Sequence, residues 1–310
     1  MCPLCSSPGN FSFQSRDLLY NKTKTYQYMR CKHCGAVYQE PMPSLAEIAS
    51  FYPDDYPQYR QLGELKWPGY ARLSVLRYKY GYSQLDVPWP SRLLAPILAL
   101  FRYRDAVRFV PNGNALDIGC GNGKFIHMMN SLGWQFQGVE FNPLAVDVCR
   151  EAGLKVFHGD LQAVAFEDNT FDLVSARHVI EHVPNPENFM CEIARILKKG
   201  GRLVIQTPNS QALGRKWFGT YWYANDVPRH LVLFHPANLH MLTERHGLRL
   251  VTKKTFTIQK NILNSWDYLT RNRGKPSKKR KLRRIFARLY VVVATVTCRG
   301  DEVFAIYEKS

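Results

Sequence analysis

The stretch NALDIGCGNGKFIHMM, residues 114–129, has the residue types and spacing of a ligand-binding loop. It reads as a short strand, a glycine turn and the start of a helix. Gly119, Gly121 and Gly123 follow a Gly-x-Gly-x-Gly pattern, which is neither a Walker loop nor the Gly-x-Gly-x-x-Gly turn of dinucleotide sites. Asp117 at the mouth of the turn would repel a pyrophosphate. The loop therefore favours a ligand with a positive charge and no phosphate, which the backbone of the glycines can approach closely.

Two further acids end the next predicted strands. Glu140 ends WQFQGVE, 23 residues beyond Asp117, where an acid can accept both hydroxyls of a ribose. Asp160 ends LKVFHGD and is placed to meet an adenine amino group. Each acid alone is compatible with a helix cap, but their shared position at strand ends favours a ligand. A cationic amino-acid end, a ribose and an adenine without phosphate describe S-adenosylmethionine.

The N-terminal region has the spacing of a metal site, since two Cys-x-x-Cys pairs are separated by 25 residues. The four cysteines are Cys2, Cys5, Cys31 and Cys34. Two pairs brought together by a hairpin supply four sulfur ligands to one tetrahedral ion, and a closed site of this kind makes zinc structural rather than catalytic. Gly35 after the second pair fits such a zinc ribbon. His33, inside the second pair, is interpreted as a residue that does not bind the ion. Free thiols and a redox dithiol are weaker alternatives, because neither pair opens a helix after a strand.

From residue 112 onward, short apolar runs alternate with helical patterns, which predicts an α/β fold with a parallel sheet. A helix is expected at PENFMCEIARILKKGG, closed by Gly200, with a strand at GRLVIQTPN after it. Ligands of such sheets bind beyond the carboxyl ends of the strands. The last two strands are expected at LRLVTKKTFT and DEVFAIYEK.

Together these features resemble the class I S-adenosylmethionine-dependent methyltransferases over residues 112–255 and the last strand. The motifs that carry the resemblance are DIGCGNG, Glu140, Asp160, FDLVSARHVIEHV and LKKGGRLVIQTPN. It implies a Rossmann-like sheet, parallel with one antiparallel strand. It also implies that Asp117 and the glycine loop hold the methionine part of the cofactor, Glu140 the ribose, and Asp160 with Leu161 the adenine.

The resemblance implies further cofactor contacts around these positions, with Arg177 and His178 lining the pocket near the sulfonium. The implied cofactor-binding residues are Asp117, Gly119, Cys120, Gly121, Gly123, Glu140, Phe141, Asn142, Asp160, Leu161, Arg177 and His178.

A hydroxyl or carbon acceptor also needs a base, and candidates follow the fourth and fifth strands. Arg229-His230-Leu231-x-x-Phe234 resembles the Glu-His-x-x-x-Phe segment of the zinc-containing sugar C-methyltransferases, in which a histidine is the base; here Arg229 replaces the Glu. We predict His230 as the base and His178 as a second catalytic residue. His182 is interpreted as a surface residue and His235, before a proline, as a capping or packing residue.

The chain is predicted to form a zinc ribbon over 1–43, a helical linker or lid over 44–111 and a methyltransferase domain over 112–310. In the linker, SLAEIASFY has the pattern of a helix capped by Ser44 with Glu47 in a capping box. Irregular chain is expected between that helix and a second one at PSRLLAPILALFRYRDAVRFV. The domain carries an insertion over 257–299.

The chain has a net charge of +17, much of it in residues 271–284, which hold nine Lys and Arg and no acid. The apolar run that follows, IFARLYVVVATV, is too short to span a bilayer. A solvated loop with a packing helix is one interpretation of the insertion, and a contact with an anionic membrane surface is the other. With no signal-peptide pattern, the expected location is cytoplasmic or peripheral on the inner face of the membrane.

These observations favour an S-adenosylmethionine-dependent methyltransferase that acts on a small-molecule, sugar, glycan or lipid-linked acceptor by O- or C-methylation, with structural zinc. An RNA methyltransferase is the alternative, because a ribbon and basic charge can hold RNA. Against it, no Asn-Pro-Pro-aromatic segment follows the fourth strand, where the sequence is ARHV. A binding module without chemistry is the third possibility, and the intact cofactor motif speaks against it.

Overall fold

The computed structural model describes residues 1–53, 68–101, 106–272 and 280–310. Contacts divide the chain into two compact units, each described below by itself. Unit 1 comprises Met1–Pro53, Ala176–Ala194 and Leu203–Ser310, and unit 2 comprises Asp54–Ser175 and Arg195–Arg202. Part of the predicted linker (54–67) and half of the predicted basic run (273–279) lie outside the described residues.

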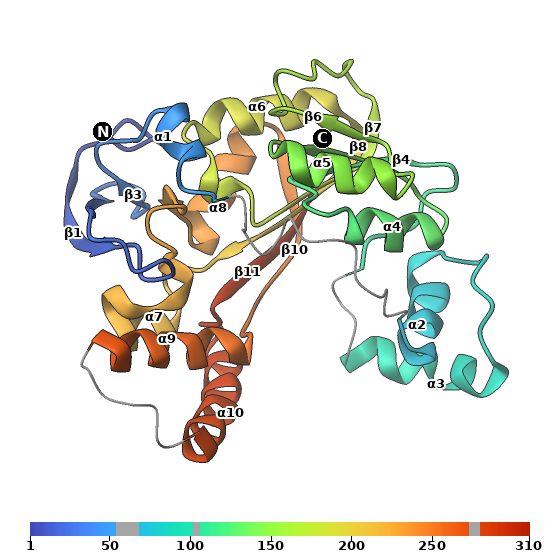
Figure 1. The fold of residues 1–310 in the computed structure, drawn as a ribbon. Coiled ribbons are helices and arrows are strands. Elements are labelled where there is room, and N and C mark those ends of the chain that lie inside the picture. The colour runs from blue at the N-terminus through green and yellow to red at the C-terminus, as the bar shows by residue number, and fades with distance from the viewer. Residues whose placement is uncertain (54–67, 102–105, 273–279) are drawn as a thin grey trace. The chain divides into compact units, whose positions relative to one another are not determined.

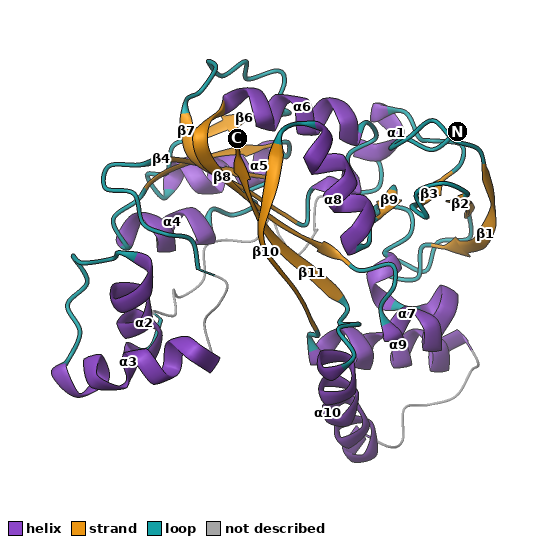
Figure 2. Ribbon diagram, turned by 180° about the vertical axis from the view of Figure 1, so that it is seen from behind, coloured by secondary structure: helices purple, strands orange, loops and turns teal. Residues whose placement is uncertain are grey.

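The expected sheet is present, and its strands run in the order β10-β11-β8-β7-β4-β5-β6 (Figure 2). Pairing is parallel between β4 and β5 and between β5 and β6, whereas β10 and β11 are antiparallel. The fold class is therefore the predicted Rossmann-like one. The strands are β4 (Asn114–Ile118), β5 (Gln135–Glu140), β6 (Val156–His158), β7 (Phe171–Arg177), β8 (Leu197–Pro208), β10 (Leu248–Phe256) and β11 (Glu302–Lys309).

Unit 2 supplies the strands that carry the predicted cofactor residues from Asp117 to Leu161. Helix α4 (Lys124–Ser131) packs on β5, and α5 (Pro143–Glu151) packs on β5 and β6. Helix α5 begins where it does because the Asn142 side chain accepts a hydrogen bond from the backbone N–H of Ala145, and Pro143 occupies the first turn, where a missing N–H costs nothing. Four of the five residues of β4 are buried, as expected for a central parallel strand.

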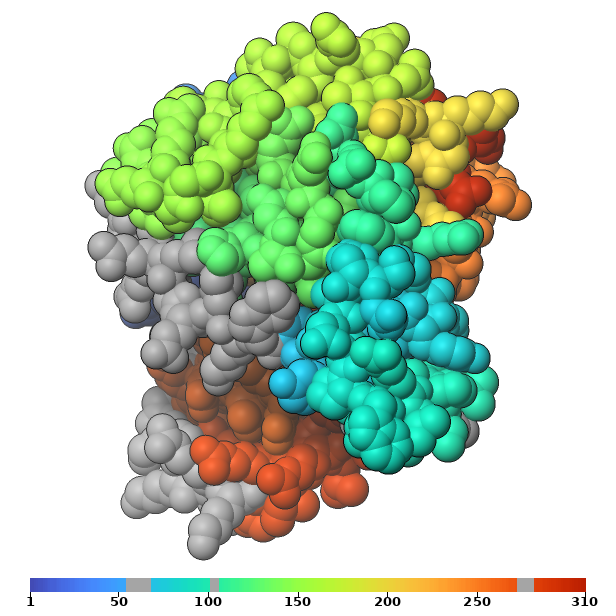
Figure 3. Space-filling model, turned by 90° about the vertical axis from the view of Figure 1, so that its right-hand side faces the viewer, coloured from blue at the N-terminus to red at the C-terminus, as the bar shows by residue number. Residues whose placement is uncertain are grey.

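Unit 2 also contains two helices before β4, α2 (Tyr70–Tyr80) and α3 (Trp89–Phe101), whose surface Figure 3 shows in cyan and teal. The prediction of irregular chain was wrong for α2, which ends at Gly81 with φ +80°. Its weak apolar periodicity explains the error, because the helix buries only the patch around Leu73–Leu76. The second expected helix ends earlier than predicted, since residues 106–110 have no regular structure.

Unit 1 begins with a small sheet whose last strand comes from far along the chain. Its order is β1-β2-β3-β9, formed by β1 (Gly9–Arg16), β2 (Thr25–Cys31), β3 (Val37–Gln39) and β9 (Val232–Leu233). Strand β3 pairs with β9 in an antiparallel register that sets Val37 opposite Leu233. The N-terminal hairpin is thus completed by the segment that directly follows His230. Helix α1 (Leu45–Ala49) has the predicted capping box of Ser44 and Glu47.

Three further α-helices lie between β7 and β10: α6 (Pro186–Ile196), α7 (Leu213–Phe218) and α8 (Pro236–Arg245). Helix α6 was predicted to continue to Gly200, but it ends at Ile196 and β8 begins at Leu197. Ile196 and Leu197 fit both the apolar spacing of a helix and that of a strand. The sequence pattern therefore could not show where α6 ends and β8 begins. His235 caps α8 by accepting from the Asn238 N–H, which confirms its interpretation as a capping residue.

The insertion between β10 and β11 consists of α9 (Gln259–Asn272) and α10 (Arg280–Val296), seen at the bottom of Figure 1. One face of α10 is buried: Ala287, Tyr290 and Ala294 pack in a cluster with Trp222 and Ile262. The Tyr290 hydroxyl donates to Asp301 at 2.7 Å. The opposite face of α10 is apolar and exposed, so the insertion is a packing element that also presents an apolar surface.

Candidate functional site

The glycine loop of unit 2 adopts the backbone that its sequence requires. Gly119, Gly121 and Gly123 have φ values of +63°, +54° and +74°, in the left-handed region that favours glycine. A Cβ atom at Gly123 would lie 2.4 Å from Leu154 Cδ1 and 2.9 Å from Cys149 Sγ. A side chain at this position would therefore meet both a close contact and a strained backbone. The N–H groups of Gly119 and Cys120 donate to the Val139 carbonyl, which ties the loop to the neighbouring strand β5.

Glu140 holds the loop from the neighbouring strand. Its Oε2 accepts from the Gly121 N–H at 2.8 Å, and its Oε1 accepts from the Asn142 N–H at 3.0 Å. Each carboxylate oxygen has a further lone pair for an incoming hydroxyl. Asp117 is 2% exposed and Glu140 is 9% exposed. The pKa of the Cys120 thiol between them is raised by its hydrogen bond with Cys149, by burial and by both carboxylate charges, so the loop is an anionic environment.

The other predicted cofactor residues of unit 2 differ in how far they are buried and in which groups they contact. Asp160 is exposed, and its Oδ1 accepts from the Ala163 N–H at 2.7 Å in a local turn. Leu161 is buried, whereas Phe141 is 59% exposed on the rim. Asn142 uses its side chain to cap α5. Asp117, Glu140 and the glycine loop therefore form one connected group, and Asp160 with Leu161 follows the next strand.

Unit 1 carries the other predicted residues, Arg177 and His178, at the end of β7. His178 has φ +56°, an uncommon backbone for this residue type. Its Nδ1 lies 3.2 Å from Oε1 of Glu181. Burial acts to lower the pKa of His178, but the hydrogen bond and charge of Glu181, with the charge of Glu302, raise it to about 9. This raised pKa makes the ring less suited to accepting a proton from a substrate.

His230 lies in a buried group with Glu181 and His182. Its Nδ1 is 2.9 Å from the Ala224 carbonyl, and its Nε2 is 4.0 Å from Oε1 of Glu181 and 3.9 Å from Oδ2 of Asp226. The rings of His182 and His230 meet edge to face, with centroids 4.7 Å apart. One ligand atom each from Glu181, His182 and His230 lies within 4.8 Å of the others.

His182 was expected on the surface, and this interpretation was wrong. Its Nδ1 is 2.9 Å from the Arg229 carbonyl and 2.8 Å from the Tyr52 hydroxyl. Burial and the nearby charge of His230 lower the pKa of His182 to about 4. The partners stand 47 and 130 residues away, so no local pattern could reveal the contact.

The N-terminal sheet fixes the backbone around His230. The Tyr28 hydroxyl donates to the His230 carbonyl at 2.8 Å, and the Gln39 N–H donates to the Leu231 carbonyl at 2.9 Å. The Leu231 N–H donates to the Glu181 carbonyl at 2.7 Å. His230 is thus held from the ribbon on one side and from the turn after β7 on the other.

Arg229, the residue that replaces the expected Glu, is fully buried between two acids. Its guanidinium donates to Asp17 at 2.8 Å and to Asp226 at 2.7 Å. Burial acts to raise the pKa of Asp226, but the charges of Arg229 and His230 hold it below its usual value. Asp17 also accepts from the N–H groups of Leu19 and Tyr20. Sequence reasoning missed Asp17, which lies 212 residues from its partner.

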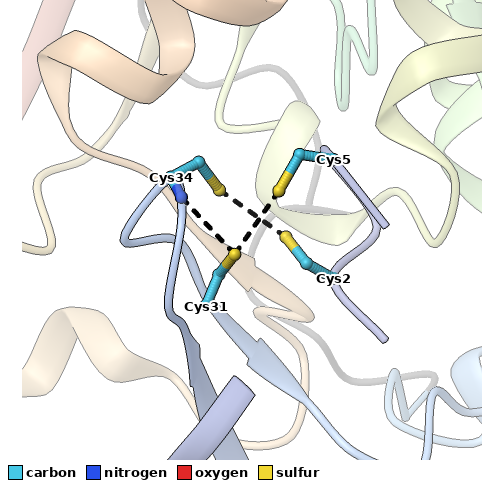
Figure 4. Close-up of side chains that lie close together, drawn as sticks. All are labelled: Cys2, Cys5, Cys31 and Cys34. Carbon is cyan, nitrogen blue, oxygen red and sulfur yellow. Dashed lines mark hydrogen bonds between the residues drawn. The ribbon is translucent and has the colours of Figure 1, made fainter. Parts of the chain in front are cut away.

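The four N-terminal cysteines converge on one point, as Figure 4 shows. The Sγ atoms of Cys2 and Cys34 are 3.6 Å apart, and those of Cys5 and Cys31 are 3.4 Å apart. All four can offer a ligand atom within 4.8 Å of the others, whereas His33 is exposed and outside this group. Nε2 of His235 lies 3.2 Å from the Cys34 carbonyl, which ties the cluster to the start of α8.

Comparison with known proteins gives consistent results for the central part of the chain. The sequence model described as "Methyltransferase domain" matches residues 91–253, more than half of the 310 residues. A ubiquinone biosynthesis O-methyltransferase of Burkholderia thailandensis is 29% identical over 173 residues, which are 49% of this chain and 72% of that protein. A protein of the same name from Maricaulis maris is 31% identical over 148 residues, 44% of this chain and 58% of its own length.

Solved structures are more distant. A SAM dependent methyltransferase from Archaeoglobus fulgidus superimposes with a TM-score of 0.46 at 18% identity, covering 76% of this chain and 99% of that one.

Arg229 gives a stability prediction. We expect Arg229→Leu to lower the free energy of unfolding by about 3–5 kcal/mol, because it leaves the buried carboxylate of Asp17 and the half-buried carboxylate of Asp226 without a counter-charge. Arg249→Leu is the matched control: its partner Glu308 is 3.3 Å away, but Arg249 is 76% exposed, so the loss should be under about 1 kcal/mol. Urea unfolding of both variants measures this, and equal losses would contradict the assigned role of Arg229.

Proposed function

The chain belongs to the methyltransferase domain family, and we propose that it transfers the methyl group of S-adenosylmethionine to a hydroxyl of a lipid-linked small molecule. The observation that carries the proposal is the glycine loop held between Asp117 and Glu140 at the ends of neighbouring parallel strands. The names of the relatives above support O-methylation of a lipid-linked acceptor. A sugar or glycan acceptor is the second candidate, supported by the four-cysteine cluster and the Arg229-His230 segment.

In this proposal the predicted cofactor residues keep their assigned roles. Asp117 and the glycine backbone take the methionine end, Glu140 the ribose, Asp160 and Leu161 the adenine, and Arg177 and His178 the region of the sulfonium. An anionic loop without a phosphate-binding turn suits a sulfonium and an ammonium group. S-adenosylmethionine supplies an activated methyl carbon, so the protein's task is to align donor and acceptor and to exclude water.

The cofactor assignment predicts that Glu140→Ala raises the dissociation constant for S-adenosylmethionine by about 100-fold, because two hydrogen bonds between the carboxylate and ribose hydroxyls are lost. Calorimetric titration of purified protein measures it. Glu151→Ala is the control, since Glu151 is exposed at the end of α5 in the same unit. Parental affinity in Glu140→Ala would reject the cofactor map.

The acceptor must lose a proton, and we assign this step to the group around His230. The Nδ1 atom of His230 faces a carbonyl, so that nitrogen carries the hydrogen and Nε2 keeps its lone pair. Glu181 and Asp226 lie within 4.0 Å of Nε2, and both carboxylates stabilise positive charge that develops there.

We expect His230→Ala to lower turnover by about 100- to 10,000-fold, the usual contribution of a group that assists proton transfer, with unchanged affinity for S-adenosylmethionine. Transfer of labelled methyl to a panel of prenylated phenols and nucleotide sugars measures turnover. His240→Ala, on α8 of the same unit, is the control. Parental turnover in His230→Ala would remove this residue from the mechanism.

We further propose that the four-cysteine cluster binds structural zinc. The sulfur atoms converge, and four thiolates close the coordination sphere. Because the hairpin between the two cysteine pairs carries Asp17 and Tyr28, which hold Arg229 and His230, the ion would stabilise the segment that carries the proposed chemistry. In this proposal the zinc stabilises the position of His230 and does not contact the acceptor.

The exposed face of α10 supports a membrane-surface location for a lipid-linked acceptor. Leu282, Ile285, Leu289, Val292 and Val296 recur at helical spacing and are each more than half exposed. Arg284 and Arg288 are exposed on the same helix. None of the helices in the described ranges is long and apolar enough to cross a bilayer. An amphipathic helix with basic flanks suits the interface of anionic lipid.

We expect the parent protein to float with phosphatidylglycerol vesicles and the double variant Leu289→Ser/Val292→Ser to lose at least about 10-fold in partitioning, because apolar area leaves the interface. The control double variant is Leu45→Ser/Val251→Ser, which changes two exposed apolar residues elsewhere in unit 1. Equal flotation of the two variants would contradict the assignment to α10.

A further inference from the structure

We propose that Glu181, His182 and His230 form a second metal site, which binds a divalent ion of the zinc class and leaves coordination positions open for the acceptor. The proposal deepens the proposed function, on which it rests for the identity of the acceptor group. All three residues belong to unit 1, and one ligand atom of each lies within 4.8 Å of the other two.

Both histidines are anchored in the way that metal-binding histidines are. The Ala224 carbonyl lies 2.9 Å from Nδ1 of His230 and can only accept, so this nitrogen donates. Nδ1 of His182 lies 2.9 Å from the Arg229 carbonyl and 2.8 Å from the Tyr52 hydroxyl, so both polar contacts of that ring are made at Nδ1. Among the described residues, no hydrogen bond engages either Nε2 atom. A hydrogen bond from Nδ1 to a backbone carbonyl orients the ring and makes the opposite nitrogen a stronger metal ligand.

The carboxylate is anchored too. Glu181 is fully buried, and its Oε2 accepts from the Thr207 hydroxyl at 2.9 Å. Its Oε1 faces Nε2 of His230 at 4.0 Å and also bonds Nδ1 of His178. A carboxylate offers about four lone-pair sites, so the bond with His178 leaves room for an ion.

The surrounding charge favours a cation. The positive charge of Arg229 is met by both Asp17 and Asp226, at 2.8 and 2.7 Å, so those three groups together carry one net negative charge. The carboxylates of Glu181 and Asp226 both lie within 4.0 Å of Nε2 of His230, so a cation bound at this nitrogen would meet two acidic groups.

The donor set also indicates the kind of ion. Two nitrogens and one carboxylate oxygen are the ligands of catalytic zinc sites, which keep a position open, in contrast to the closed four-sulfur cluster. Ligand atoms about 2 Å from one zinc ion lie roughly 3–3.5 Å from each other. The 4.0 Å between Oε1 and Nε2 of His230 therefore needs to close by less than about 1 Å.

Such an ion would give His230 a different task from that of a base. An acceptor hydroxyl bound to the ion loses its proton to water, because the ion lowers the pKa of the bound group. The oxygen then uses a lone pair to form a bond to the methyl carbon, while the carbon–sulfur bond breaks and its electron pair stays on the sulfur of S-adenosylhomocysteine. The net change is one methyl group transferred and one proton released.

Metal counting tests the proposal on the full chain. Protein dialysed against buffered Zn²⁺ should contain two ions by mass spectrometry, and His230→Gln and Glu181→Gln should each contain one. His240→Gln should keep two. Because variants of buried residues can unfold, Thr207→Val serves as a mild probe: loss of the hydroxyl on Oε2 should weaken Zn²⁺ affinity at this site by about 10-fold or more.

A single ion in the parent protein, unchanged in His230→Gln and Glu181→Gln, would overturn the metal site. If His230→Ala still loses turnover in that case, the proposed function stands and His230 acts as a base. If the second ion is present but no acceptor is methylated, the metal site stands and the acceptor assignment fails.

Discussion

Placement of the residue before His230 is the constraint on which the candidate site depends. The Arg229 side chain is fully buried. Burying a guanidinium costs less free energy when acidic groups pair with it. One of those acids, Asp17, comes from the N-terminal hairpin, and the other, Asp226, from the turn before Arg229. The pairing of β3 with β9 then continues the contact as backbone hydrogen bonds. The ribbon is therefore part of the framework that sets the position of the His230 ring.

The proposed zinc would reinforce this arrangement. Strand β3 has three residues and β9 has two, so their pairing supplies few backbone hydrogen bonds. An ion held by the four converging cysteines would stabilise the N-terminal sheet to which β9 is added. On the proposed assignments, the chain separates two kinds of ligand group: four converging sulfurs beside the N-terminal sheet, and the nitrogen and oxygen atoms of Glu181, His182 and His230.

Sequence reasoning succeeded where function depends on local patterns. The glycine loop, Asp117 and Glu140 stand at fixed distances along consecutive strands, so spacing alone predicted their proximity. The spacing of the two Cys-x-x-Cys pairs likewise predicted that the four sulfur atoms would converge, which they do.

It failed where a contact joins remote parts of the chain. His182 looked like a surface residue, since its partners Tyr52 and Arg229 are not its neighbours in sequence. The role of Asp17 could not be predicted from the sequence, because single acidic residues are common in hairpins and nothing near it in sequence points to Arg229. The helix α2 was missed because its apolar residues form a patch rather than a stripe.

The completion of the N-terminal sheet by β9 has a consequence for how the protein can be divided. The recognisable family segment, residues 91–253, omits both the hairpin that supports His230 and strand β11, which pairs with β10. A fragment cut at those limits would leave one edge of β9 unpaired. It would also expose Arg229 to water, because its partner Asp17 would be missing. Anyone who transplants this domain into a hybrid enzyme must therefore carry both ends of the chain with it.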